Sequence, residues 1–379
     1  MTQQMSSRER ILASLHSKET DRLAWAPLVD DYFISSIAHQ GYHSDIIATT
    51  RDVIACDFIE RHVASPIERF KNVTCNIQTE NGTVRTVYET PVGSIFQEEK
   101  FSGNTKYVAK HFVETVEDIK VYTWICANTF YDADIKRFLA REKEISDAGI
   151  ATIDGNMSPI QELLQYKSGV ENTVYLQMDY PDEMEELLSV MHERNLRQYQ
   201  VAAQYPTEVV FDYEDTSTTV MSRTMFEQYS LPAINAYAKI LKESGKLFIT
   251  HMCGKLTGFA DLIARGEQDG IDSVCPPNTG DLCAWNARKA WGNKKVVIGG
   301  IDPPSLVMLK PEEILQNVAE VLRRVDNKRG FILSTGDAVS YGTPMENLCV
   351  ISRLLKELGE NSLGNEVPEI VLQKILRNK

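Results

Sequence analysis

The sequence predicts an α/β protein with one (β/α)8 barrel, the TIM-barrel fold, that spans residues 1–379 and carries an inserted antiparallel β-sheet near its N-terminal third. From about residue 148 onwards, short runs rich in valine and isoleucine alternate with longer amphipathic segments, as in repeated βα units around a parallel sheet. The predicted strands number eight, which closes such a barrel. A chain of 379 residues suits one large barrel and is short for several ordinary domains. A doubly wound sheet is the lesser alternative.

The predicted strands are short and mostly apolar, and the segments between them have helical periodicity. In chain order the strands are Leu23–Val29, Val53–Phe58, Ala148–Asp154, Glu208–Tyr213, Lys246–Met252, Ile271–Cys275, Lys295–Ile301 and Gly330–Ser334. The clearest helices are Ser6–Ser17, Pro181–Tyr205, Arg223–Ser244, Leu256–Glu267 and Pro311–Asp326. This order of elements is typical of a chain that winds repeatedly from strand to helix and back.

Residues 72–111 break this rhythm, because polar and apolar residues alternate there as they do in half-exposed strands. Asn81-Gly82 joins two such runs and is typical of a tight β-hairpin turn. Pro91-Val92-Gly93 marks a second turn. We therefore predict an inserted β-hairpin sheet over residues 72–111, laid over one mouth of the barrel.

The composition argues against several classes of function. The formal net charge is −13, and the basic residues are scattered among acidic ones, so we expect neither a nucleic-acid partner nor an anionic membrane surface. No stretch approaches the roughly 20 apolar residues of a membrane span, and the first residues lack the apolar core of a signal peptide. The seven cysteines lack the spacing of a disulfide framework, which favours a reducing, cytoplasmic location.

Polar residues gather at the predicted C-terminal ends of the strands, where the active sites of such barrels lie. They are Asp30 and Asp31, Asp154, Glu214 and Asp215, His251 and Cys253, Cys275, Asp302, and Asp337. Acidic residues are common at strand ends in any barrel, and one of them alone means little. Their convergence on one rim favours a functional site.

The most specific pattern is His251-Met252-Cys253-Gly254. In an extended segment, residues i and i+2 point to the same face, so the imidazole and the thiol would project together. Zinc accepts both ligand types, whereas the alternative is a buried histidine and a buried cysteine near a turn. A catalytic zinc needs a third ligand and an open position. Glu214, Cys275 and Asp337 are the candidates for that third ligand.

Two further segments contain candidates for chemistry. Glu214 opens a dense run of acceptors and hydroxyls, Glu214-Asp215-Thr216-Ser217, and lies too early to cap the next helix. Asp337 and Tyr341 follow the last strand and precede the final helix. The motifs G-x-G-x-x-G, G-x-x-x-x-G-K-[ST] and G-x-S-x-G are absent, which argues against nucleotide cofactors and a serine hydrolase.

Four segments resemble the uroporphyrinogen decarboxylase superfamily. They are SSRERILASLHSKETDRLAWAPL, THMCGKLTGFADLIARGEQDGIDSV, VVIGGIDP and FILSTGDAVSYGTPMENL. The resemblance runs over nearly the whole chain and implies a (β/α)8 barrel. The superfamily includes decarboxylases and corrinoid-dependent methyltransferases. The decarboxylases carry arginines after the first strand, where this chain has the acidic Asp30 and Asp31. The methyltransferases carry a zinc-binding H-x-C and a later cysteine, and Asp337 stands in place of that cysteine.

The segments KHFVETVEDIKVY, YEDTSTT, HMCG and STGDAVSYGTP are most similar to methyltransferases of anaerobic O-demethylase systems. This similarity implies transfer of a methyl group from a methoxylated aromatic, an aryl methyl ether, to the Co(I) of a corrinoid (cobalamin) protein. Zinc on His251 and Cys253 would polarise the ether oxygen. Glu214 or Asp337 would complete the coordination or act as general acid, and Tyr341 would donate a proton or bind a ring substituent.

We further assign substrate binding to three of the acidic residues at strand ends, namely Asp30, Asp154 and Asp302. The chain has no D-x-H-x-x-G corrinoid motif, so the corrinoid is expected on a separate protein. Barrels of this kind commonly form homodimers. The alternatives are a methylcorrinoid:thiol methyltransferase, a tetrapyrrole decarboxylase and a non-catalytic corrinoid-binding scaffold.

Overall fold

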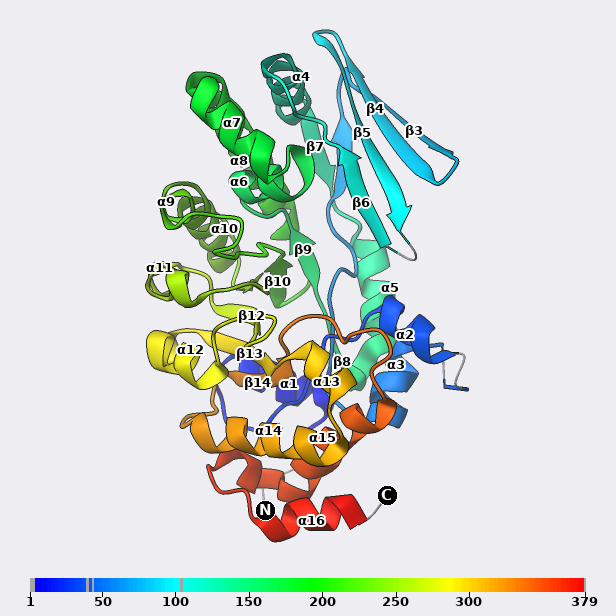
Figure 1. Ribbon diagram of the computed structural model, residues 1–379, viewed down its shortest axis with the longest axis vertical. Helices are drawn as coiled ribbons and strands as arrows, with labels where there is room; N and C mark the ends of the chain where they lie inside the picture. The colour runs from blue at the N-terminus through cyan, green and yellow to red at the C-terminus, as the bar shows by residue number, and fades with distance from the viewer. Residues whose placement is uncertain (1–3, 39–40, 43, 103–104, 378–379) are drawn as a thin grey trace.

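A computed structural model describes residues 4–38, 41–42, 44–102 and 105–377, and its centre is a parallel barrel (Figure 1). Six parallel strands pair in the order β14-β13-β12-β11-β10-β9. Their bounds are β9 (Ile153–Gly155), β10 (Val209–Asp212), β11 (Leu247–His251), β12 (Gly270–Val274), β13 (Val296–Ile301) and β14 (Phe331–Thr335). Beside them, β8 (Gly149–Ala151) leads into β9 and pairs in parallel with β1 (Phe58–Glu60).

The segment around Trp25 closes the ring. Trp25 forms a parallel bridge with Leu333 of β14, and on its other side the Trp25 carbonyl accepts a hydrogen bond from the backbone N–H of Asp57, at 2.7 Å. The predicted strand Leu23–Val29 is thus present as isolated bridges between β14 and β1. The prediction of an eight-stranded TIM barrel is confirmed.

One predicted strand is wrong. Residues 46–54 are helical, as α3 (Ile46–Ala48) followed by the π-helix η1 (Thr49–Ile54), and the strand begins only at Phe58. Ile47, Thr50 and Ile54 are buried at the helical spacing i, i+3 and i+7. Short β-branched runs fit either structure, and here packing of this helical face decides.

The helices surround the barrel and occupy its ends. The helices that precede β10 in the chain, besides α3, are α1 (Ser7–Leu15), α2 (Asp31–Ala38), α4 (Val116–Ala127), α5 (Ile135–Ile145), α6 (Pro159–Glu162), the π-helix η3 (Leu163–Lys167), α7 (Val170–Asp179) and α8 (Pro181–Ala202). They continue with α9 (Arg223–Met225), the π-helix η4 (Phe226–Ser230), α10 (Leu231–Glu243), α11 (Ala260–Arg265), α12 (Ala284–Trp291), α13 (Pro303–Met308), α14 (Pro311–Arg324), α15 (Met345–Leu358) and α16 (Glu369–Arg377). No described helix is long and apolar enough to cross a membrane.

The core has two apolar clusters that follow the alternation of the strands. Val209 and Phe211 of β10 belong to a cluster with Ile249 of β11 and residues of β13 and β14, which fills the barrel interior. Val210, between them, belongs to the larger cluster, which includes the helices packed around the sheet. This alternation decides which polar side chains point into the barrel beyond the last apolar layer.

The inserted segment is a four-stranded antiparallel sheet in the order β3-β4-β5-β6. Its strands are β3 (Thr74–Glu80), β4 (Thr83–Thr90), β5 (Gly93–Ser102) and β6 (Thr105–Lys110). Asn81 and Gly82 form the first turn with φ of +48° and +75°, as a type I′ turn requires. A second antiparallel pair joins β2 (Ile67–Phe70) and β7 (Thr129–Asp132).

The sheet contacts α4, and Figure 1 shows it beside that helix. Gln97 of β5 donates a hydrogen bond to the Tyr166 carbonyl at 2.8 Å, which fastens the sheet to the segment that follows β9. That the sheet lies over the barrel mouth remains a prediction.

Candidate metal and active site

A cavity of about 920 Å³ lies at the C-terminal ends of the barrel strands. Residues from separate strands and loops line it, among them Asp30, Arg61, His62, Asp215, His251 and Asp337. Cys253 also reaches this cavity. The barrel interior below this cavity is filled by apolar side chains.

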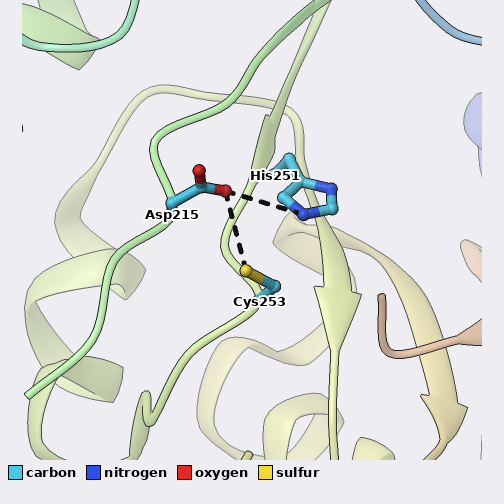
Figure 2. Close-up of side chains that lie close together, drawn as sticks. All are labelled: Asp215, His251 and Cys253. Atoms are coloured by element: carbon cyan, nitrogen blue, oxygen red, sulfur yellow. Dashed lines mark hydrogen bonds and ion pairs between the residues drawn. The ribbon is translucent and has the colours of Figure 1, made fainter. Parts of the chain in front are cut away.

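Figure 2 shows three possible metal ligands, Asp215, His251 and Cys253, whose side chains converge. All three line the cavity. His251 Nε2 lies 3.7 Å from Asp215 Oδ1. Cys253 Sγ lies 3.6 Å from the same carboxylate oxygen. The three ligand atoms all lie within 4.8 Å of one another, and no other group of this kind occurs among the residues that the structure describes. The i, i+2 spacing of His251 and Cys253 brings both side chains to the same face.

His251 is held from behind by a buried carboxylate. Its Nδ1 donates to Asp272 Oδ2 at 2.8 Å, and Arg61 binds the other oxygen of Asp272 at 2.7 Å. Burial alone would raise the pKa of Asp272, but Arg61 and His251 hold it at about 2. Burial alone would lower the pKa of His251, and Asp272 raises it instead. In the neutral tautomer that this bond favours, Nε2 is left as an acceptor for a metal.

Asp215 is fixed by hydrogen bonds at both ends. Its backbone N–H donates to the His251 carbonyl at 2.9 Å, and Gln165 Nε2 donates to its Oδ2 at 2.7 Å. Its backbone φ of +41° is uncommon for a residue with a side chain and ends the extended conformation of β10. These contacts leave Oδ1 facing His251 and Cys253.

The donor set fits a zinc ion. In a tetrahedral site, ligand atoms at the usual Zn–N, Zn–O and Zn–S distances lie roughly 3.4–3.6 Å apart. The separations of Asp215 Oδ1 from His251 Nε2 and from Cys253 Sγ, 3.7 and 3.6 Å, are close to this. Burial raises the pKa of the Cys253 thiol, and the carboxylates of Asp215 and Asp337 raise it further. The thiolate therefore needs a cation beside it. Three protein ligands would leave a fourth position open to the cavity, as in catalytic zinc sites.

Glu214, predicted as a ligand and catalytic residue, points to the other side of β10. Ser158 donates to it through its backbone N–H at 2.7 Å and through its hydroxyl at 2.5 Å. Burial raises the pKa of Glu214 to about 7, although these hydrogen bonds act in the opposite direction. Alternation along the strand explains the placement, because Phe211 and Asp215 share the interior face. Asp215 thus stands where Glu214 was expected.

The other predicted residues are divided between the cavity and its surroundings. Asp337 and Asp30 line the cavity, and Asp30 also caps α2 through the backbone N–H of Phe33 at 2.7 Å. Asp154 binds His62 at 3.0 Å. Tyr341 is half-exposed and packs against Tyr32, with ring centroids 5.1 Å apart.

Asp302 and Cys275 have structural surroundings. Asp302 caps α13 through Ser305 and accepts a hydrogen bond from the Thr279 hydroxyl at 2.7 Å. It lines a separate cavity between α12, α13 and α14. Cys275 is buried, and burial raises the pKa of its thiol to about 12. Neither residue belongs to the cluster of ligand atoms.

The sequence reasoning missed the basic residues of the site. Arg61, Arg137 and Arg141 line the same cavity as Asp30 and Asp31, which were expected to make this part of the rim acidic. Arg61 pairs with Asp272, and Arg141 binds Glu60 at 2.7 and 2.8 Å. Arg61 follows β1, whose position was predicted several residues too early, and Arg141 comes from α5, which was not predicted. Arg61, directly after a strand, was the one signal that a βα loop offered.

The family profile of uroporphyrinogen decarboxylase (URO-D) matches residues 150–358. A methylated-thiol–coenzyme M methyltransferase of Methanosarcina mazei is 26% identical over 193 residues, which cover 50% of this chain and 49% of that protein. A uroporphyrinogen decarboxylase of Carboxydothermus hydrogenoformans is 28% identical over 196 residues, which cover 49% of this chain and 51% of that protein. The chain spans about half the length of these curated relatives.

The solved structure of a methyltransferase from Methanosarcina mazei superimposes with a TM-score of 0.59 at 14% identity, over 92% of this chain and 98% of that one. At this identity the likeness shows the shared barrel fold. The family profile covers more than half of the chain, from β8 through α15. The chain therefore belongs to the uroporphyrinogen decarboxylase (URO-D) family.

Proposed function

We propose that this protein is a methyltransferase that takes a methyl group from an aryl methyl ether and passes it to the Co(I) of a corrinoid protein. The observation that carries the proposal is the ligand set of Asp215, His251 and Cys253 at the mouth of the barrel. These residues would hold zinc, and the bound ion would act as a Lewis acid toward the ether oxygen.

The carboxylate in this set favours an oxygen donor. A carboxylate is a harder ligand than a second thiolate and leaves the metal more Lewis-acidic. An unactivated ether needs such help, because negative charge develops on the oxygen that leaves. Asp337 adds a further carboxylate to the cavity, at the position where the resemblance placed a cysteine.

The rest of the chain orients the reactants. The cluster is held by hydrogen bonds from behind, from the buried Asp272 to His251 and from the partly buried Gln165 to Asp215, so its geometry is fixed before substrate arrives. The cavity opens at the end of the barrel, where the cobalamin of a separate protein would approach the methyl group. The sequence has no corrinoid motif of its own, which supports a partner protein as the carrier.

A methylated thiol is the second candidate donor, because one relative is a methylated-thiol–coenzyme M methyltransferase. A thiol reaction would use the same cavity, with zinc bound to the sulfur of the substrate.

A tetrapyrrole decarboxylase is the remaining alternative, and it would need basic side chains to pair with the many carboxylates of its substrate. Of the cavity arginines, Arg61 and Arg141 are already paired with Asp272 and Glu60.

The test is a comparison of donors. Purified protein with one equivalent of zinc is incubated with chemically reduced cobalamin and a methoxylated benzene, a methylated thiol or uroporphyrinogen. The proposal expects methylcobalamin from the ether, with loss of this activity in His251→Ala and Cys253→Ser. Methylcobalamin from the thiol alone would establish the second candidate, and decarboxylation of uroporphyrinogen would overturn both.

A further inference from the structure

A second histidine, His62, lies in the same cavity as the ligand cluster. Its ring stacks on the ring of Tyr213, with centroids 4.0 Å apart and planes at 15°. The centroids of the Tyr213 and His251 rings lie 5.0 Å apart. Both imidazoles thus touch the same phenol ring. The backbone of His62 has a φ of +63°, a left-handed conformation uncommon for residues with a side chain and frequent at functional sites.

His62 is held by a carboxylate. Its Nδ1 lies 3.0 Å from Asp154 Oδ2, and the Ser65 hydroxyl donates to the other oxygen of Asp154. A carboxylate at Nδ1 fixes the orientation of the ring and leaves Nε2 facing away from it. Both oxygens of Asp154 are engaged in this way. The structure therefore gives Asp154 a partner within the protein, in place of the direct substrate contact that the sequence suggested.

The second ring nitrogen of His62 is open to a ligand. No described residue forms a hydrogen bond with Nε2, and the side chain is 51% exposed on the cavity wall. Among the other nitrogen and sulfur groups of this wall, His251 and Cys253 belong to the ligand cluster, and Arg61 and Arg141 are paired with Asp272 and Glu60. His62 is the group in this wall that combines an unbound nitrogen with a carboxylate partner.

We propose that His62, oriented by Asp154, donates the proton that the departing oxygen of the substrate receives. This inference rests on the proposed function. As the methyl carbon bonds to Co(I), which supplies the electron pair and becomes Co(III), the C–O bond breaks and its pair stays on oxygen. The Nε2 proton of the imidazolium then moves to that oxygen, directly or through one water, and gives the phenol. Exposure of His62 lets solvent restore the proton.

Leaving-group dependence tests the role, because a good leaving group needs no proton. Single-turnover methyl transfer to chemically reduced cobalamin is measured with methoxybenzene and with 4-cyano-methoxybenzene, whose phenol is far more acidic. General acid catalysis is worth about 10²–10⁴-fold. His62→Gln is expected to slow methoxybenzene by about 100-fold or more and the cyano ether by less than about 10-fold. Asp154→Asn, which changes a positioning residue, follows the same pattern with about a tenth of the effect.

His16→Gln is the matched control, since His16 is half-exposed and binds Glu208 at 3.2 Å outside the cavity. It should leave both rates unchanged. Zinc content and thermal midpoint are recorded for each variant, and Asp154→Asn decides the question if His62→Gln does not fold. Equal slowing of both ethers, or no slowing, overturns the role of His62. A wild-type protein that demethylates neither ether overturns the proposed function itself and the inference with it.

Discussion

Asp272 accepts a hydrogen bond from Nδ1 of His251 at 2.8 Å while lying fully buried against Arg61. The two residues come from neighbouring strands, β11 and β12, which pair in parallel with His251 directly opposite Asp272. Strand register therefore sets the contact, and loop conformation does not. A carboxylate behind a metal-binding histidine orients the ring and increases its basicity.

Asp272→Asn should weaken zinc binding by about 10–100-fold, because the amide no longer compensates the charge that the metal draws from His251. Competition with a chromogenic chelator measures the affinity. Asp261→Asn is the control, since Asp261 pairs with Arg223 on the exposed surface and does not belong to the ligand cluster. Equal affinities for wild type and Asp272→Asn would contradict the assignment of His251 Nε2 as a ligand.

Asp215 and Glu214 are adjacent but should respond to substitution in opposite ways. Asp215→Ala removes a donor from the cluster, so bound zinc should fall from about one per chain toward none, with the fold retained. Glu214→Gln should keep its zinc, because Glu214 faces Ser158 and the helical layer. Elemental analysis after gel filtration gives both values. Zinc loss in Glu214→Gln with retention in Asp215→Ala would restore Glu214 as the third ligand.

The contrast between these two residues shows how far the sequence could lead. The barrel was predictable because apolar strands and amphipathic helices alternate along the chain, and the inserted sheet because Asn81-Gly82 permits a narrow class of turn. The choice between Glu214 and Asp215 required the register of β10. Val209 and Phe211 face the barrel interior, and counting onward by two reaches Asp215. The spacing from Phe211 to Asp215 can be read from the sequence, but its use requires knowing which face of β10 points into the barrel.

Other parts of the site depend on contacts between distant segments. His62 and Asp154 are 92 residues apart, and nothing local in either segment indicates their pairing. Asp302 occupies a strand end as expected, yet its oxygens bind Ser305 and Thr279. A capping carboxylate and a catalytic carboxylate look alike in sequence, because both follow a strand and precede a helix.

Zinc removal should abolish activity without unfolding the barrel. The apolar clusters that hold the strands together exclude the ligand residues Asp215, His251 and Cys253. Ligand binding to the native state adds stability only through mass action, about 2.7 kcal/mol at a hundredfold excess over Kd. Dialysis against a chelator should therefore lower the thermal midpoint by a few degrees and leave the far-ultraviolet circular dichroism unchanged. Activity should return on addition of zinc, and cooperative unfolding on chelation would contradict a catalytic site of this kind.

Glu162 and Arg194 form a buried ion pair that fixes α6 against α8, and the segment after α6 carries Gln165, the partner of Asp215. Burial alone would raise the pKa of Glu162, but Arg194 and Lys167 lower it below its ordinary value of 4.5. Tyr122 donates a further hydrogen bond to this carboxylate at 3.0 Å. A carboxyl group whose pKa is lower in the folded than in the unfolded state stabilises the fold at any pH above its unfolded-state pKa. This contribution is lost as the pH falls through its folded-state pKa.

Glu162→Gln should therefore reduce the free energy of unfolding by about 3 kcal/mol at pH 7, because Arg194 keeps a buried charge without its partner. The difference from wild type should shrink as the pH falls below 4.5, since protonation then removes the same charge from the wild-type carboxylate. Urea denaturation of both proteins between pH 7 and a pH below 4.5 measures this difference in the free energy of unfolding. Glu320→Gln breaks the exposed pair with Arg324 and should cost less than about 1 kcal/mol. A pH-independent difference for Glu162→Gln would mean that packing, and not charge, holds α6 in place.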